Sequence, residues 1–230
     1  GVQTCALPIL PFINPLARSS PMNPLRNLSL ILVACVGILM AILAQNVQGQ
    51  SEGPAYREME LQGWKVRIRE ELDREHAKPL SKALELLEKQ LAEITRVVPG
   101  PALEKLRSVT LWLSPTYPGE QARAEYHPGA GWLVEHHRDP KMERGVEFTN
   151  ILIFEEETRR MPNFALHELA HAYHHQFLAQ GFSNPEVEKA YSNAKKQGDY
   201  ERVEQRFADG SSKITKAYGM NNPAEYFAES

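Results

Sequence analysis

Cysteine is almost absent from this chain. Its two cysteines, Cys5 and Cys35, both lie in the first 49 residues, so residues 50–230 contain none. A domain in that range cannot form an internal disulfide and must be stabilised by its hydrophobic core and by any metal that it binds. The same absence excludes metal sites that use a thiolate ligand.

A large excess of charge of either sign is also missing. The formal net charge is −3, and 24% of the residues are charged while 42% are hydrophobic. No basic cluster of the size that binds nucleic acid is present. The sequence shows no internal repeat, and no low-complexity tract beyond its first 21 residues. This composition predicts one globular domain over residues 50–230 and no nucleic-acid partner.

Residues 1–21 are expected to be a leader that is foreign to the native protein. Gly1–Ile9 resembles the translation of a common sequencing adapter, and no methionine precedes Met22. The remaining leader residues are rich in proline and show no hydrophobic periodicity. Because such a segment carries no information about the fold, we leave it out of the predicted domain.

Residues 22–49 are typical of a secretory signal peptide. Arg26 gives a short basic start, and Leu30–Ala44 is an apolar run that is shorter than the ~20 residues of a membrane-spanning helix. We therefore expect a bacterial protein that is secreted or periplasmic. Two alternatives would attach it to a membrane: a lipid anchor on Cys35, which follows a lipobox-like sequence, or an N-terminal segment that is not cleaved.

The strongest chemical signal is His167-Glu168-Leu169-Ala170-His171, the H-E-x-x-H pattern of zinc hydrolases. Residues four apart lie on the same face of a helix, so the imidazoles of His167 and His171 can reach one cation. Glu168 projects beside that cation and can take a proton from a water molecule. We predict a helix from Pro162 to Gln180 around this motif.

A site with two histidines needs a third protein ligand. The metzincin pattern would need Gly at 174 and His at 177, where this chain has His174 and Phe177. A glutamate downstream remains, and Glu225 lies on a predicted helix that Asn222 caps and Pro223 begins. The alternative is that Glu225 completes a capping box with Asn222 and binds no metal.

These residues resemble a known family. His167-Glu168-x-x-His171 with Glu225-x-x-x-Glu229 is similar to the gluzincin pattern, with Glu in place of the final Asp. The segment from Tyr218 to Glu229 resembles the metal-binding end of metallopeptidases of the anthrax lethal factor type. The resemblance covers the last third of the chain. It implies an α+β, zincin-like fold with a small mixed sheet and an active-site helix.

The expected function is that of a secreted zinc metallopeptidase. We expect one Zn²⁺ per chain, held by His167, His171 and Glu225. Glu229 lies on the same helix face as Glu225 and is expected to accept the outer N–H of a ligating imidazole. Such a site would act on a peptide or protein substrate.

Two further residues are expected to act on the substrate. Glu168 would deprotonate the attacking water and later protonate the leaving amine. Tyr218 would steady the oxyanion, as the resemblance implies, and the alternative is an ordinary buried tyrosine at the end of a strand. Two other functions remain open: a non-catalytic, exported zincin-fold module that binds peptides, and a metal-dependent hydrolase of other substrates.

Hydrophobic patterning places the remaining elements. We predict a β-hairpin over Tyr56–Glu70, a helix over Pro79–Arg96 and a strand over Val109–Leu113. A further strand is predicted over Val146–Ile153, and the resemblance implies that it is an exposed sheet edge. A second C-terminal helix should run from Pro185 to Gln197.

Other segments leave alternatives open. Residues 200–214 fit either a helix or a hairpin. His127, His136 and His137 belong to a second metal site, to a substrate loop or to an ordered loop packed by Trp132. His174 and His175 either support the metal ligands or pack at the end of the helix. The pattern after Glu225 has no helix stop, which predicts that the domain is truncated at its C-terminus.

Overall fold

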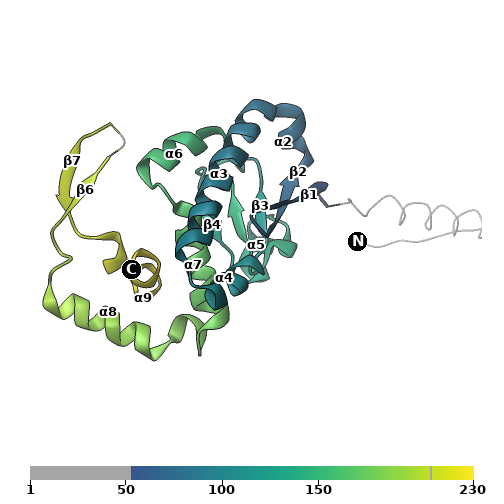
Figure 1. Cartoon of the computed structure of the whole chain (residues 1–230). Helices are drawn as coiled ribbons and strands as arrows, with labels where there is room; N and C mark the ends of the chain where they lie inside the picture. Colours follow the sequence, from purple (N-terminus) through teal and green to yellow (C-terminus); the bar gives the residue numbers. More distant parts are fainter. Residues whose placement is uncertain (1–52, 208) are drawn as a thin grey trace, which may run out of the picture. The chain divides into compact units, whose positions relative to one another are not determined.

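A five-stranded mixed sheet lies at the centre of the fold (Figure 1). The computed structural model describes residues 53–207 and 209–230, so the predicted leader and signal peptide lie outside it. The strand order is β1-β2-β3-β5-β4, in which β1/β2 and β4/β5 are antiparallel and the other pairs are parallel. The strands are β1 (Tyr56–Leu61), β2 (Trp64–Arg69), β3 (Leu111–Leu113), β4 (Ala124–Tyr126) and β5 (Val146–Phe148).

Helices and a separate two-stranded sheet complete the structure. The antiparallel pair β6 (Val203–Arg206) and β7 (Ser212–Thr215) settles the segment that fitted either a helix or a hairpin. The α-helices are α2 (Glu70–Glu75), α3 (Ala77–Val97), α4 (Gly100–Arg107), α5 (Ala130–Glu135), α6 (Phe154–Arg160), α7 (Phe164–Phe177), α8 (Pro185–Gln197) and α9 (Pro223–Glu229). Short 3₁₀ turns are η1 (Pro140–Met142), η2 (Ile151–Ile153), η3 (Gly181–Ser183) and η4 (Tyr218–Met220). The fold is thus mixed α and β, which is compatible with the α+β prediction.

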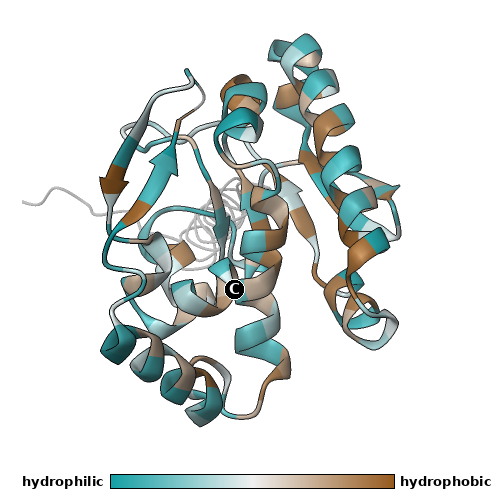
Figure 2. Ribbon diagram, turned by 60° about the vertical axis from the view of Figure 1, so that its left-hand side comes forward, coloured by the Kyte–Doolittle hydropathy of each residue, from teal (hydrophilic) through white to brown (hydrophobic). Residues whose placement is uncertain are grey.

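The core forms where α3, α6 and α7 pack on the central sheet. The predicted helix is confirmed as α3, which begins at Ala77, two residues before its predicted start. Its apolar residues step by three and four: Leu80, Leu87, Leu91 and Ile94 are buried, and Leu84 is partly buried against the same core. In Figure 2 brown and teal residues follow one another along the helices, as expected for amphipathic elements. This core fixes α7, the helix that carries the H-E-x-x-H motif.

The predicted strand over Val146–Ile153 is only partly correct. Strand β5 ends at Phe148, and Ile151–Ile153 is a 3₁₀ turn. The expectation that β5 is an exposed edge is wrong, because β5 lies between β3 and β4 and its residues are buried. The apolar residues Ile151, Leu152 and Ile153 resemble the continuation of a strand, but the turn buries Ile151 and leaves the other two exposed. The edge of the sheet next to α7 is formed by β4 instead.

Helix α7 is shorter than predicted at both ends. Asn163 is its N-cap, with Oδ1 accepting from the backbone N–H of Leu166 at 3.0 Å, so Pro162 lies before the helix and not in its first turn. The helix ends at Phe177 because Leu178 has an extended backbone. The motif nevertheless lies inside the helix, where the four-residue spacing holds.

The two C-terminal helices begin as predicted. Asn184 caps α8, accepting from the N–H groups of Glu186 and Val187, and Gly198 ends the helix with a φ of 77°. Asn222 caps α9 in the same way. Over the part of the chain that the structure describes, no helix has both the length and the apolar character needed to cross a membrane.

Candidate metal centre

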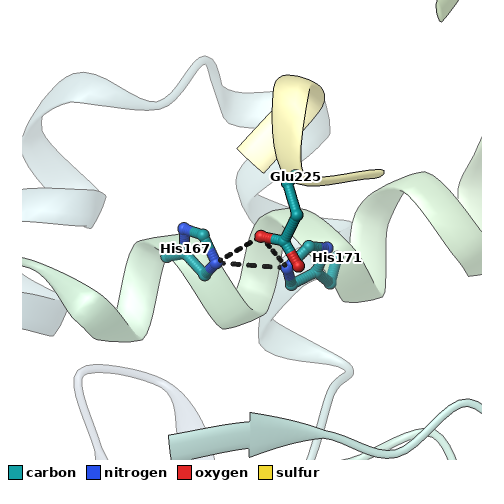
Figure 3. Close-up of side chains that lie close together, drawn as sticks. All are labelled: His167, His171 and Glu225. Atoms are coloured by element: carbon teal, nitrogen blue, oxygen red, sulfur yellow. Dashed lines mark hydrogen bonds and ion pairs between the residues drawn. The ribbon is translucent and has the colours of Figure 1, made fainter. Parts of the chain in front are cut away.

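Three potential metal ligands converge between α7 and α9 (Figure 3). Nε2 of His167 lies 3.2 Å from Nε2 of His171. Oε2 of Glu225 lies 3.2 Å from the first of these nitrogens and 3.4 Å from the second. Among the described residues, this is the only group of three or more His, Cys, Asp or Glu side chains arranged to hold a metal ion.

The spacing of these atoms fits a zinc ion. Tetrahedral ligands about 2.0–2.1 Å from Zn²⁺ are separated from one another by about 3.3 Å, and the three observed separations lie between 3.2 and 3.4 Å. Oε2 of Glu225 is buried and accepts no well-aligned hydrogen bond from the described residues. Three electron-pair donors that face one another in this way are unfavourable unless a proton or a cation lies between them.

The position of Glu225 decides between its two predicted roles. The backbone N–H of Glu225 donates to Oδ1 of Asn222 at 2.9 Å, so the cap is made by the main chain of Glu225. Its carboxylate is directed at the two histidines and not back at the cap. The geometry therefore favours the role of the Glu225 carboxylate as a metal ligand over its alternative role in a capping box, where it would bond back to the N–H of Asn222.

Neighbouring elements hold α9 against α7. The hydroxyl of Tyr191 on α8 donates to the carbonyl of Met220 at 3.1 Å and so fixes η4. A Cβ at Gly219 would lie only 3.3 Å from Cα of Tyr226 and from Cβ of Glu229. Glycine at this position therefore lets η4 approach α9 closely. That approach helps to position α9, the helix that carries the carboxylates of Glu225 and Glu229.

Glu229 lies where the sequence predicted it. Its Oε1 is 2.9 Å from Nδ1 of His167, on the side of the ring away from Glu225. The two atoms form a close ion-pair contact and not a well-aligned hydrogen bond. A carboxylate at this nitrogen favours a proton on Nδ1 and leaves Nε2 free to bind a metal.

Glu168 is partly buried beside the two histidines. Burial raises the pKa of its carboxyl group to about 7, although the positive charges of His167 and His171 lower it. Its Oε2 accepts the backbone N–H of Tyr126 at 2.9 Å. This contact ties the carboxylate to the edge strand β4. No sequence pattern predicts it, because it joins residues that are 42 positions apart.

Tyr218 lies in η4 at the edge of the site. Its ring centre is 6.2 Å from that of His167, and its side chain is 58% exposed. The alternative of a buried tyrosine at a strand end is therefore wrong. Partial burial and the nearby carboxylates of Glu225 and Glu168 raise the pKa of its phenol, so the hydroxyl keeps its proton and can donate it in a hydrogen bond.

The charges of the metal-free site predict how the stability of the folded protein depends on pH. Burial lowers the pKa of His167, but Glu225 and Glu229 raise it to about 9. Burial raises the pKa of Glu225, but His167 and His171 lower it to about 2. The stabilisation from His167 is complete below its unfolded pKa of about 6.5 and is lost as the pH rises through 9. The stabilisation from Glu225 is present above its unfolded pKa of about 4.5 and is lost as the pH falls through 2.

The folded pKa of Glu168, about 7, lies above its unfolded value of about 4.5, so its stabilisation is lost as the pH rises through 7. We therefore expect the metal-free protein to be most stable near pH 4.5. Its free energy of unfolding should fall by about 2–3 kcal/mol between pH 6.5 and 9, measured by denaturant titration in the presence of a chelator. His167→Asn should remove most of this fall, whereas His136→Asn, at an exposed position, should keep it. An equal fall in both variants would contradict the assignment to His167.

The other histidines are not brought into this site. His174 is fully buried against Phe182 and Phe227, with ring centres 5.3 and 4.9 Å away, and its ring nitrogens bond to none of the described residues. Nδ1 of His175 lies 2.8 Å from the hydroxyl of Tyr126. Burial lowers the pKa of both histidines, so they pack as neutral rings.

The segment after β4 forms a packed structure around Trp132. The ring of His136 stacks on Trp132 with centres 3.9 Å apart, and this tryptophan lies on α5. His127, from the same histidine-rich segment, is buried with Nε2 3.0 Å from Glu147. Arg138 also bonds to Glu147, at 3.1 Å. The ordered, Trp132-packed alternative fits this arrangement.

Comparison of the chain with protein-family models, with curated proteins and with solved structures found no match. The chemistry of the chain is therefore inferred from the geometry of the site and from the two sequence motifs.

Proposed function

We propose that this protein is a zinc-dependent metallopeptidase of the gluzincin type, with a zincin-like fold. The observation that carries this proposal is the convergence of His167, His171 and Glu225, with the carboxylate of Glu168 next to them. Two histidines and a glutamate leave one position of a tetrahedral zinc ion free, as in catalytic zinc sites. Zinc bound there would supply Lewis acidity, by making water more acidic and by polarising a substrate carbonyl.

Glu168 is the proton carrier in this proposal. Its carboxylate takes a proton from the attacking water and delivers it to the nitrogen of the leaving amine, so that the C–N bond breaks without expelling an amide anion. The N–H of Tyr126 holds Oε2 in place at 2.9 Å. One carboxylate oxygen is therefore fixed, and the other is left for the proton.

Tyr218 and Glu229 would assist from two sides. The phenol of Tyr218 is exposed, protonated and on the rim of the site, where it can donate to the carbonyl oxygen as negative charge develops on it. Glu229 orients His167 through the ion pair at Nδ1. Neither residue needs to contact the attacking water.

A peptide substrate is favoured by the sheet edge beside the site. In the described sheet β4 pairs only with β5. Its outer edge therefore presents backbone groups to an extended chain, apart from the N–H of Tyr126, which Glu168 accepts. Ala124 on β4 lines the same cavity as His167 and Glu168. We also propose that the protein acts after export, on the basis of the signal-like residues 22–49.

The test is zinc content together with peptide hydrolysis. The purified protein should contain about one zinc per chain, and it should cleave members of a mixed peptide library detected by mass spectrometry. Removal of zinc by 1,10-phenanthroline should abolish cleavage, and added zinc should restore it. A protein with full zinc that cleaves no peptide would contradict the proposal.

A further inference from the structure

A cavity of about 430 Å³ adjoins the metal centre. Its walls include His167, Glu168 and Tyr218 on one side and Ala124 of the edge strand on another. The hairpin contributes Gln205 and Arg206 of β6. A substrate held along β4 at the metal centre would therefore have neighbouring side chains inside this cavity.

Three arginines from separate elements line the cavity: Arg123 before β4, Arg160 at the end of α6 and Arg206 on β6. The described lining also contains three carboxylates, but Glu168 and Glu229 are engaged at the two histidines. Away from the metal centre, the lining thus holds three guanidinium groups and one carboxylate, that of Glu157. Three glutamates outside the lining also pair with the arginines: Glu120 and Glu125 with Arg123, and Glu204 with Arg206.

The glutamate partners leave part of each guanidinium free. Glu157 bonds to Nε and Nη2 of Arg160 at 3.1 and 2.7 Å, and Glu204 bonds to the same atoms of Arg206 at 3.2 and 3.0 Å. Neither glutamate uses Nη1. At Arg123, Glu120 and Glu125 lie nearest to Nη2, at 3.6 and 3.1 Å. Exposed ion pairs of this kind contribute little to stability, and a guanidinium has five N–H donors. A further carboxylate can therefore be bound without breaking these pairs.

Asn150 gives an independent sign that the cavity receives a ligand. It lines the cavity, its side chain is 1% exposed, and neither Oδ1 nor Nδ2 bonds to any residue that the structure describes. A buried amide without partners is unfavourable. A bound peptide can satisfy it, because each peptide unit offers one acceptor and one donor.

We propose that this cavity binds a carboxylate of the peptide substrate, either an acidic side chain near the scissile bond or the free C-terminus. Arg123, Arg160 and Arg206 would hold it by charge-assisted hydrogen bonds, and Asn150 would bind the adjoining main chain. This inference rests on the proposed peptidase function and names the substrate class of the same site.

The experiment uses the zinc-loaded full chain and a mixed peptide library, with cleavage products identified by mass spectrometry. Asp or Glu should be enriched at one fixed distance from the cleaved bond if a side chain is bound. Cleavage at one fixed distance from the peptide end, lost when that end is amidated, identifies the free C-terminus. For the best peptide, an uncharged copy with Asn, Gln or an amide should have a kcat/KM at least tenfold lower.

Arginine variants then locate the subsite. Arg123→Gln, Arg160→Gln and Arg206→Gln should each reduce the preference for the charged peptide about fivefold to tenfold, with the uncharged peptide little changed. Arg206 is exposed, so Arg206→Glu should fold and should shift the preference towards a peptide with Lys. Arg96 on α3 is a matched control, because it is exposed and pairs with Glu93. Arg96→Gln should leave kcat/KM unchanged for both the charged and the uncharged peptide. Zinc content checks that each variant is intact.

Equal kcat/KM values for the charged and uncharged peptides would overturn the inference, as would an unchanged preference in all the cavity variants. In both of these cases cleavage itself persists, so the proposed function stands. A zinc-loaded wild type that cleaves nothing would instead overturn the proposed function, and the inference with it.

Discussion

Replacing Glu168 with Gln should lower kcat/KM for peptide hydrolysis by about 10²- to 10⁴-fold while zinc stays bound. Glutamine keeps the size of the side chain and can still accept the N–H of Tyr126, which lies 2.9 Å from Oε2 in the wild type. It cannot take a proton at neutral pH, so water activation and proton delivery to the amine are both lost. The measurement is hydrolysis of a fluorogenic peptide at saturating zinc, together with the zinc content of the variant.

Glu188→Gln is the matched control, because Glu188 is an exposed glutamate on α8. It should have wild-type activity. If Glu168→Gln retained full hydrolysis, Glu168 would not be the base. If wild type and variant bound peptides equally and neither hydrolysed them, the non-catalytic binding module would replace the peptidase.

Glu225→Ala should weaken zinc binding by at least about 100-fold, since it removes one of three protein ligands. Helix α9 should survive, because the capping bond to Asn222 comes from the backbone N–H of Glu225, which alanine retains. Zinc affinity is measured by competition with a chromogenic chelator, and circular dichroism confirms the fold. Peptide hydrolysis should disappear along with the metal.

Glu188→Ala should leave zinc affinity unchanged and serves as the control for a lost carboxylate. Full zinc in Glu225→Ala would remove this residue from the site, despite its 3.2 and 3.4 Å distances to the histidines. The glutamate would then matter only for the local charge balance, as an anion that stabilises a protonated His167.

Local sequence rules were sufficient to predict the two helical segments that form the metal centre. The four-residue spacing of His167 and His171 places them on one face of a helix, and the Asn222-Pro223 start fixes α9, so Glu225 and Glu229 share a face. The stripe on α3, the hairpin β1-β2 and helix α8 follow from equally local patterns. The limits of α7 were less predictable, because its cap at Asn163 competes with the preceding proline.

The arrangement of these pieces was decided only in three dimensions. That β4 and not β5 forms the sheet edge depends on pairing between strands far apart in the chain. The contact of Tyr126 with Glu168 and the gathering of three arginines in one cavity likewise leave no periodic signal. The sequence by itself therefore determined which side chains can bind a metal and on which helix faces they lie, since helix geometry and capping act over a few residues. Tertiary packing of α9 against α7 brought the donors together and placed the cavity beside them, because these contacts join segments that lie far apart in the chain.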